Sequence, residues 1–274
     1  MMTHSLRFSK KHFVGMPVAK PAGETARPAP QEPEPSAHSV EAEAAGYVIN
    51  PEKQELIEAD RRYYRRMAIR THVFTHDDNL IDAVRRYAEK LLLPGDILFL
   101  SEKAVACTQH RAIPLNEIHP RPLARFLCRF VQKTPCGIGL GIPETMEMAL
   151  RECGTPRILA AAAVSACGKL IGRHGWFYRI AGPRAASIDG PCACTIPPYN
   201  HCVVLGPENP DETAQTLAEA LGCPVAIVDI NDLGAAILGV SDASLDRSLL
   251  CRILRDNPLG QGRQSTPLGI IRGI

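Results

Sequence analysis

The chain has 274 residues, enough for one large domain or two small ones, and its 45% hydrophobic content is that of a folded protein. A formal net charge of +2 and an aromatic content of only 5% argue against nucleic acid or an anionic membrane as a partner. No stretch reaches the roughly 18 consecutive apolar residues of a membrane span, and no signal sequence is evident, so we expect a cytoplasmic protein.

Residues 1–45 form the first segment. Six prolines between Pro17 and Pro35 alternate with Ala, Glu, Gln and Ser, which leaves too little apolar surface to offset the entropy of ordering. We therefore expect a disordered tail. Its basic start is able to dock a partner, but a solvated tail is the favoured interpretation.

Residues 46–68 are predicted to be a helical lead-in, with a charged helix from Glu52 to Met67. A β-rich stretch follows at Thr71–Thr75. The remaining residues, 69–274, are predicted to form the domain that carries the function.

Strands and helices then alternate along this domain. The first helix is expected to be capped by Asp77 or Asp78 and to end before Pro94. Further helices are predicted over 120–133, 143–152, 157–171 and 244–255 and after residue 205, and strands over 96–100, 176–181, 201–205, 224–229 and 267–272. The Ala-rich helix 157–171 is apolar almost all round and should pack tightly. The alternation predicts an α/β or mixed α+β fold.

The first candidate site is an acidic loop that starts at Ser187 and places Asp189 before Gly190 and Pro191. The prolines of this loop hold it stiffly, which suits a carboxylate that must lie about 2.1 Å from a magnesium-like ion. The alternative is an Asx-turn, in which Asp189 bonds its own backbone. The residues alone leave these two interpretations equal.

The second candidate site is an acidic loop predicted directly after the strand 224–229, with Asp229, Asn231 and Asp232. Acidic residues just past the carboxyl end of a buried strand lie where open α/β sheets commonly place ligands. Two carboxylates and an amide supply the oxygen ligands that Mg²⁺ or Mn²⁺ prefers. An ordinary polar turn is the alternative, and we favour the ligand site.

Basic residues provide candidate phosphate contacts. Lys103 follows the strand 96–100 and is able to place a point charge on a phosphate. A second basic group contains Lys169, Arg173 and His174. Because helix ends attract basic residues for reasons of their own, this second group is weak evidence.

Two further patterns are less favoured. The glycines of 137–141 resemble a phosphate cradle before a helix, but Glu144 in the first turn would repel phosphate, so we expect packing glycines. A zinc site is also disfavoured. Its possible ligands would be Cys192, Cys194, His201 and Cys202, but their spacing is unlike that of structural zinc sites. The ten cysteines are otherwise scattered, as in a chain of buried thiols without a disulfide framework.

Taken in order, these stretches resemble the ligase family that adds γ-linked glutamate to the deazaflavin coenzyme F-420. The resemblance runs from about Ile69 to Ile274 and rests on five segments: IRTHVFTHDDNLIDAV, GDILFLSEKAVACTQHRAI, HGWFYRIAGPRAASIDG, NHCVVLGPENPDETA and GQGRQSTPLGIIRG. The third segment matches a family block at His174, Gly175 and Asp189.

The resemblance implies a two-metal amide ligase with mixed sheets, packed helices and an intertwined homodimer. It implies that GTP (or ATP), with Mg²⁺ or Mn²⁺, phosphorylates a small carboxylic acid, and that an amino acid, glutamate in the family, attacks the acyl phosphate. It assigns Lys103 and His174 to catalysis, Lys103, Asn200 and Asn231 to the nucleotide, and Asp189, Asp229 and Asp232 to the metal. The register of the second loop stays open between Asp229, Asn231 and Asp232.

The chain departs from the family pattern at three places. Cys107 stands where the family has a second lysine, and Ala235 stands where it has an arginine. The family's later metal-binding glutamate has no clear counterpart, and Arg247 is the nearest residue. These departures support an alternative: a non-catalytic nucleotide-binding, ligand-binding or regulatory protein that retains the fold but lacks a full metal site.

Overall fold

The computed structural model of the chain describes residues 37–131, 139–170, 172, 176–193, 195–232 and 234–274. They belong to one compact unit that spans Ser36–Ile274. The interpretation of residues 1–36 as a tail, and the roles predicted for Arg173 and His174, lie outside the described residues. Helix α1 (Ala37–Ala44) falls at the end of the segment predicted to be a tail.

A mixed sheet forms the centre of the described chain. Its six strands have the order β1-β2-β8-β3-β6-β7. They are β1 (Leu56–Ala59), β2 (Arg62–Ile69), β3 (Ile97–Ser101), β6 (Val225–Asn231), β7 (Gly234–Val240) and β8 (Leu268–Gly273). Strands β3 and β6 run parallel, whereas the other neighbouring pairs are antiparallel. The predicted mixed α+β fold is confirmed.

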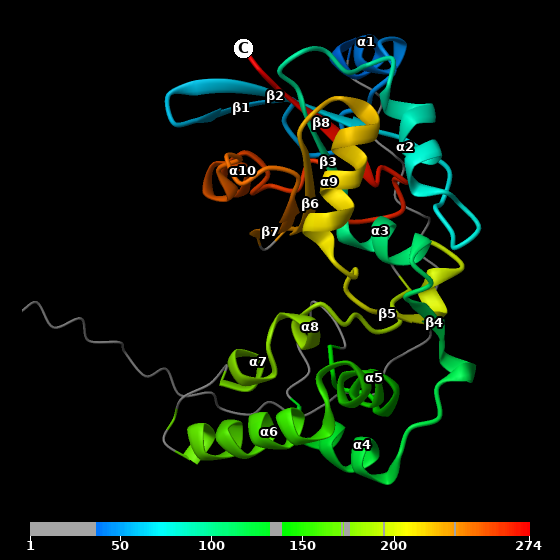
Figure 1. Cartoon of the computed structure of the whole chain (residues 1–274), viewed down its shortest axis with the longest axis vertical. Coiled ribbons are helices and arrows are strands. Elements are labelled where there is room, and N and C mark those ends of the chain that lie inside the picture. Colours follow the sequence, from blue (N-terminus) through cyan, green and yellow to red (C-terminus); the bar gives the residue numbers. More distant parts are fainter. Residues whose placement is uncertain (1–36, 132–138, 171, 173–175, 194, 233) are drawn as a thin grey trace, which may run out of the picture. The chain divides into compact units, whose positions relative to one another are not determined.

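Helices cover both faces of this sheet (Figure 1). Helices α2 (Leu80–Ala88), α3 (Glu102–Thr108) and α9 (Pro210–Leu221) pack on the face that carries Leu98 and Ile227. Helix α10 (Arg247–Ile253) packs on the other face, against Phe99. Because the central strands are buried on both sides, their sequences are unbroken apolar runs. This pattern is why β3, β6 and β8 were predicted correctly.

A second core lies among the remaining helices, which form a group of their own in Figure 1. These are α4 (Pro122–Leu127), α5 (Pro143–Cys153), α6 (Thr155–Leu170), α7 (Trp176–Ala181) and α8 (Pro183–Ala186), with the 3₁₀ turns η1 (Leu115–Glu117), η2 (Cys128–Phe130) and η3 (Tyr199–His201). A two-stranded ribbon of β4 (Ala112–Pro114) and β5 (Cys202–Val204) adjoins them.

The charged helix predicted over 52–67 is wrong. The segment forms the hairpin of β1 and β2. Its turn residues Asp60 and Arg61 both have positive φ, 51° and 62°, the combination that matches the twist of the flanking strands. The β-rich stretch predicted at 71–75 has no strand, because pairing with β8 ends at Ile69.

Two further local predictions are corrected. Residues 176–181 form helix α7 and not a strand, because packing against α6 overrides the strand preference of their aromatic side chains. Helix α2 is capped by Asn79 rather than by Asp77 or Asp78: its Oδ1 accepts hydrogen bonds from the backbone of Ile81 and Asp82. The apolar helix α6 buries only one side, and Leu159 on it is 42% exposed.

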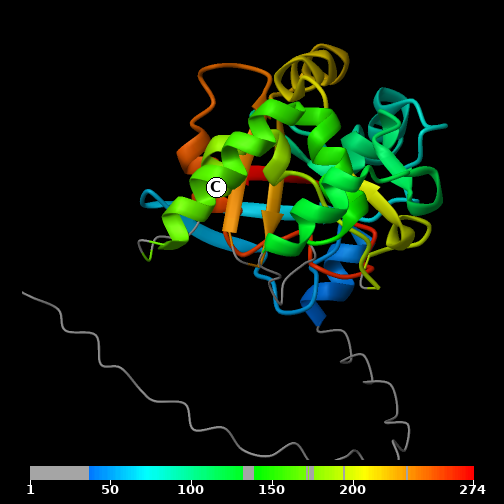
Figure 2. The same cartoon turned by 90° about the horizontal axis from the view of Figure 1, so that it is seen from below.

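The second acidic loop is in fact the end of a strand. Strand β6 continues through Asp229 to Asn231 and pairs with β7, which was not predicted. Figure 2 shows the two strands side by side. Because Asp229 is paired with Ala236 in a ladder, its backbone position is fixed by the sheet.

Gly239 of β7 is required by the close approach of α9. A Cβ atom at this position would lie 2.3 Å from the carbonyl carbon of Pro210, where only backbone is available to move. We expect Gly239→Ala to destabilise the fold by about 3 kcal/mol through overpacking. Gly234→Ala in the same strand meets nothing within 4 Å and serves as the control. Urea denaturation of both variants tests this; equal midpoints would contradict the prediction.

None of the described helices is long and apolar enough to cross a membrane.

Candidate functional site

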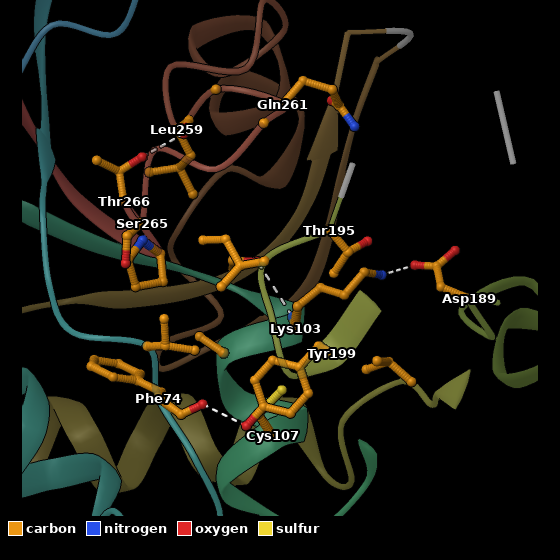
Figure 3. A pocket seen from close by; sticks show the side chains of 18 of the residues that line it. Phe74, Lys103, Cys107, Asp189, Thr195, Tyr199, Leu259, Gln261, Ser265 and Thr266 are labelled. Atoms are coloured by element: carbon orange, nitrogen blue, oxygen red, sulfur yellow. Dashed lines mark hydrogen bonds and ion pairs between the residues drawn. The ribbon is translucent and has the colours of Figure 1, made fainter. Parts of the chain in front are cut away.

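A pocket of about 340 Å³ opens where the carboxyl end of β3 meets three connecting segments. Its walls include His72, Lys103, Asp189, Tyr199 and Gln261. In Figure 3, Leu259 and Gln261 lie on one side of Lys103, and Phe74 and Tyr199 lie on the other. The pocket therefore joins parts of the chain that are far apart in sequence.

Lys103 is placed by the junction between β3 and α3. Strand β3 ends at Ser101, whose Oγ caps the helix by accepting a hydrogen bond from the Lys103 backbone at 3.3 Å. The ammonium of Lys103 forms an ion pair with Asp189 and donates to Glu102 Oε1 at 3.1 Å. It is the only Lys or Arg side chain among the described residues that line the pocket.

Asp189 is fixed by its backbone. Its N–H donates to Val204 at 2.8 Å and its carbonyl accepts from Val204 at 3.0 Å, which forms a bridge to β5. The carboxylate is half exposed and pairs with Lys103 across the pocket. This arrangement favours the ligand interpretation over the Asx-turn.

Glu102 is a functional candidate that the sequence reasoning missed. Its side chain is only 4% exposed. Burial raises the pKa of this carboxyl group, the positive charge of Lys103 opposes the rise, and the negative charge of Asp229 adds to it. Oε1 is bound by Lys103, whereas Oε2 has no hydrogen-bond partner within the described chain. The sequence feature that indicates Glu102 as a site residue is its position at the carboxyl end of a buried strand.

Asp229 reaches the same region through the parallel pairing of two strands. Ser101 of β3 is the register partner of Val228 of β6. The next residues, Glu102 and Asp229, therefore follow at the same edge of the sheet, and their charges interact. The two strand ends thus place Asp229 near Glu102, which in turn contacts Lys103.

Asp232 lies outside this arrangement. Its carboxylate is bound by Lys53 at 2.7 Å, and its backbone N–H donates to Gln261. Asn231, predicted to contact the nucleotide, pairs with Gly234 at the end of β6. Asn200 lies on η3 beside Tyr199, and of these two only Tyr199 is among the described residues that line the pocket.

The floor of the pocket is neutral where the resemblance places a second lysine. Cys107 is buried, and burial raises the pKa of its thiol to about 11, so the thiol is uncharged at neutral pH. It interacts with Tyr199, whose hydroxyl donates to the Phe74 carbonyl at 2.7 Å. The pocket therefore has one fewer cation than the family pattern provides.

The cysteines of this region do not support zinc. Cys192 lines the pocket and is disulfide-bonded. The prediction that the cysteines are all free thiols is therefore wrong at this residue. A disulfide-bonded sulfur is also not a thiolate ligand for zinc. Among the described residues, no three His, Cys, Asp or Glu side chains are grouped as a preformed metal cage requires. Magnesium in nucleotide enzymes is usually held by only one or two carboxylates together with substrate phosphates. Asp189 fits that kind of site.

Residues 68–233 match the family model described as F420-0:Gamma-glutamyl ligase, which is more than half of the 274-residue chain. The match contains Lys103, Asp189 and Asp229, but it ends before β7 and before the pocket wall around Gln261. No curated protein matches the chain.

Proposed function

The chain belongs to the F420-0:gamma-glutamyl ligase family, and we propose that it is a nucleotide- and divalent-metal-dependent enzyme that joins a small carboxylic acid to an amino acid through an amide bond. The observation that carries this proposal is the pair formed by Lys103 and Asp189 across the pocket. A cation for phosphate and a carboxylate for metal are two of the groups that enzymes of phosphoryl transfer use.

The proposed reaction has two steps. An oxygen of the acid attacks the γ-phosphorus of GTP or ATP, so that the bond to the β-phosphate breaks and an acyl phosphate and a nucleoside diphosphate form. The amine then attacks the acyl carbon, inorganic phosphate leaves, and the amine proton passes to solvent. Glutamate is the expected amine. A bound Mg²⁺ or Mn²⁺ supplies charge neutralisation on the phosphates.

The proposal gives a role to two pocket side chains and to three residues outside the described pocket lining. Lys103 binds the transferred phosphate through charge-assisted hydrogen bonds. Asp189 is the direct metal ligand, and Asp229 adds negative charge behind it. His174 and Asn200 stay as candidates from the family resemblance. The family resemblance also leads us to propose a homodimer, which light scattering of the purified chain tests.

The direct test has two stages. We expect calorimetry to show binding of GTP, ATP or both in the presence of Mn²⁺, and no binding of either nucleotide would exclude the proposal. We then expect phosphate release that requires both a carboxylic acid and glutamate. Because the acid is unidentified, a panel of small hydroxy and aromatic acids is used as the probe.

A binding protein without turnover is the second candidate. Cys107 provides no charge in the pocket, and Arg247, nearest to the position of the family's metal-binding glutamate, instead pairs with Asp211 at 2.6 Å. This candidate predicts nucleotide binding without release of phosphate for any acid. Acid-dependent release would eliminate it.

A further inference from the structure

We propose that Glu102 is a metal-ligating residue, which together with Asp189 binds a divalent cation at the point where the Lys103 ammonium contacts both carboxylates. This site deepens the proposed function and depends on it, because the cation is the one that accompanies the nucleotide. It assigns a direct role to a side chain that the family resemblance leaves without one.

The position of the Lys103 ammonium defines the site. It lies 3.1 Å from Glu102 Oε1 and also contacts Asp189 Oδ2. Two carboxylates from separate elements therefore converge on one cation. A metal ion at that point would have an oxygen from each, and one or two carboxylates are the usual protein contribution to a magnesium–nucleotide site.

The second oxygen of Glu102 is a buried atom without a hydrogen bond. Oε2 has no hydrogen-bond partner in the described chain, although the side chain is only 4% exposed. An unpaired, buried polar atom is costly, and coordination of a cation is one way to satisfy it. The orphaned oxygen and the hard oxygen donors around it fit Mg²⁺ or Mn²⁺.

The charges around Glu102 and Asp189 also favour the binding of a divalent cation. The Lys103 ammonium is shared by the carboxylates of Glu102 and Asp189, and the negative charge of Asp229 also acts on Glu102. A divalent cation would offset this excess of negative charge. It would also release the Lys103 ammonium from both carboxylates, which leaves it free to bind phosphate.

Glu102 also compensates for a departure from the family pattern. Arg247 is a cation without a lone pair to donate, so it cannot replace the family's metal-binding glutamate. Glu102 approaches Asp189 from a different part of the chain and restores a carboxylate to the site.

Binding of Mn²⁺ to the full chain tests this site, with and without GTP, and electron paramagnetic resonance of free Mn²⁺ is the readout. We expect Glu102→Gln to weaken Mn²⁺ binding at least about tenfold. Lys103→Met is expected to strengthen the binding of Mn²⁺ alone, because the ammonium no longer competes for the same oxygens. Glu89→Gln, a change of the same kind at a carboxylate that is 63% exposed and directly follows α2, should leave the affinity unchanged.

A double-variant measurement separates a ligand from a residue that only positions Lys103. If Glu102 is a ligand, Glu102→Gln still weakens Mn²⁺ binding in the Lys103→Met background. No further loss in that background would overturn the assignment. If Glu102→Gln fails to fold by circular dichroism, Lys103→Met alone decides: an unchanged or lower affinity for Mn²⁺ rejects the shared site.

The outcomes also distinguish this inference from the proposed function. Mn²⁺ binding that depends on Asp189 and not on Glu102 would reject Glu102 as a ligand and leave the ligase proposal standing. Loss of binding in Asp232→Asn with retention in Glu102→Gln would do the same. Absence of Mn²⁺ binding by the unaltered chain in the presence of GTP would reject both.

Discussion

Asp189→Asn is expected to abolish the Mn²⁺-dependent binding of GTP, with a loss of about 100-fold or more. Loss of an outer-shell partner of a metal already costs about 10–100-fold, and a direct ligand should cost at least as much. The amide keeps the shape of the side chain but not its charge. Because the backbone of Asp189 is held by Val204, the loop should keep its position and the Tm should change little.

Without metal, the loss of GTP affinity caused by Asp189→Asn should disappear. Asp189 pairs with Lys103, so Asn at this position removes a competitor for the ammonium and a repulsion toward phosphate. We expect metal-free GTP binding to be unchanged or stronger. Calorimetry with Mn²⁺ and with a chelator measures both affinities. An equal loss in the two conditions would indicate a folding defect, and no loss in either would remove Asp189 from the site.

Asp256→Asn should lower the stability of the fold far more than a matched change at a surface ion pair. The guanidinium of Arg66 is fully buried and forms an ion pair with Asp256. Removal of the negative charge leaves a buried cation without its counter-ion, a change that typically costs about 3–5 kcal/mol. Because Asp256 is 35% exposed, solvent screens the pair, and we expect about 3 kcal/mol, the lower end of that range.

Urea denaturation of the full chain measures this loss, and a matched surface pair provides the control. Asp60 binds Arg252 with both side chains about half exposed, so Asp60→Asn is expected to cost less than about 1 kcal/mol. Similar costs for the two variants would show that burial of Arg66 does not govern the effect.

The same pair gives a pH dependence. Burial raises the pKa of Asp256, but the hydrogen bonds and charge of Arg66 outweigh it and hold the pKa below the ordinary value of 3.8. A depressed pKa contributes stability that is present above the ordinary value and is lost as the pH falls through the lower one. The stability difference between the unaltered chain and Asp256→Asn should therefore be constant near neutral pH and shrink in acid. A difference that grows in acid would contradict this account.

Three strands of the central sheet could be predicted from the sequence, because the pattern that indicates them lies within each strand's own residues. Strands β3, β6 and β8 are short apolar runs bounded by polar or turn residues, and burial on both faces produces that pattern. The junction that follows β3 places Lys103, and the Gly-Pro after Asp189 marks its loop. These two side chains, predicted separately, are the pair that meets in the pocket.

Only the tertiary structure decided which acidic residues join that pair. Asp232 and Glu102 look equivalent in sequence, since each is a carboxylate near the end of a buried strand. Pairing of β6 with β7 turns Asp232 toward Lys53, whereas the parallel register of β3 and β6 brings Glu102 beside Asp229. The hairpin of β1 and β2 and helix α7 were missed for a related reason: their conformations depend on partners that lie elsewhere in the chain. Composition and periodicity predict most of the helices and strands. Which side chains meet in the site depends on long-range strand pairing, because the register of a sheet places side chains from separate segments at one edge.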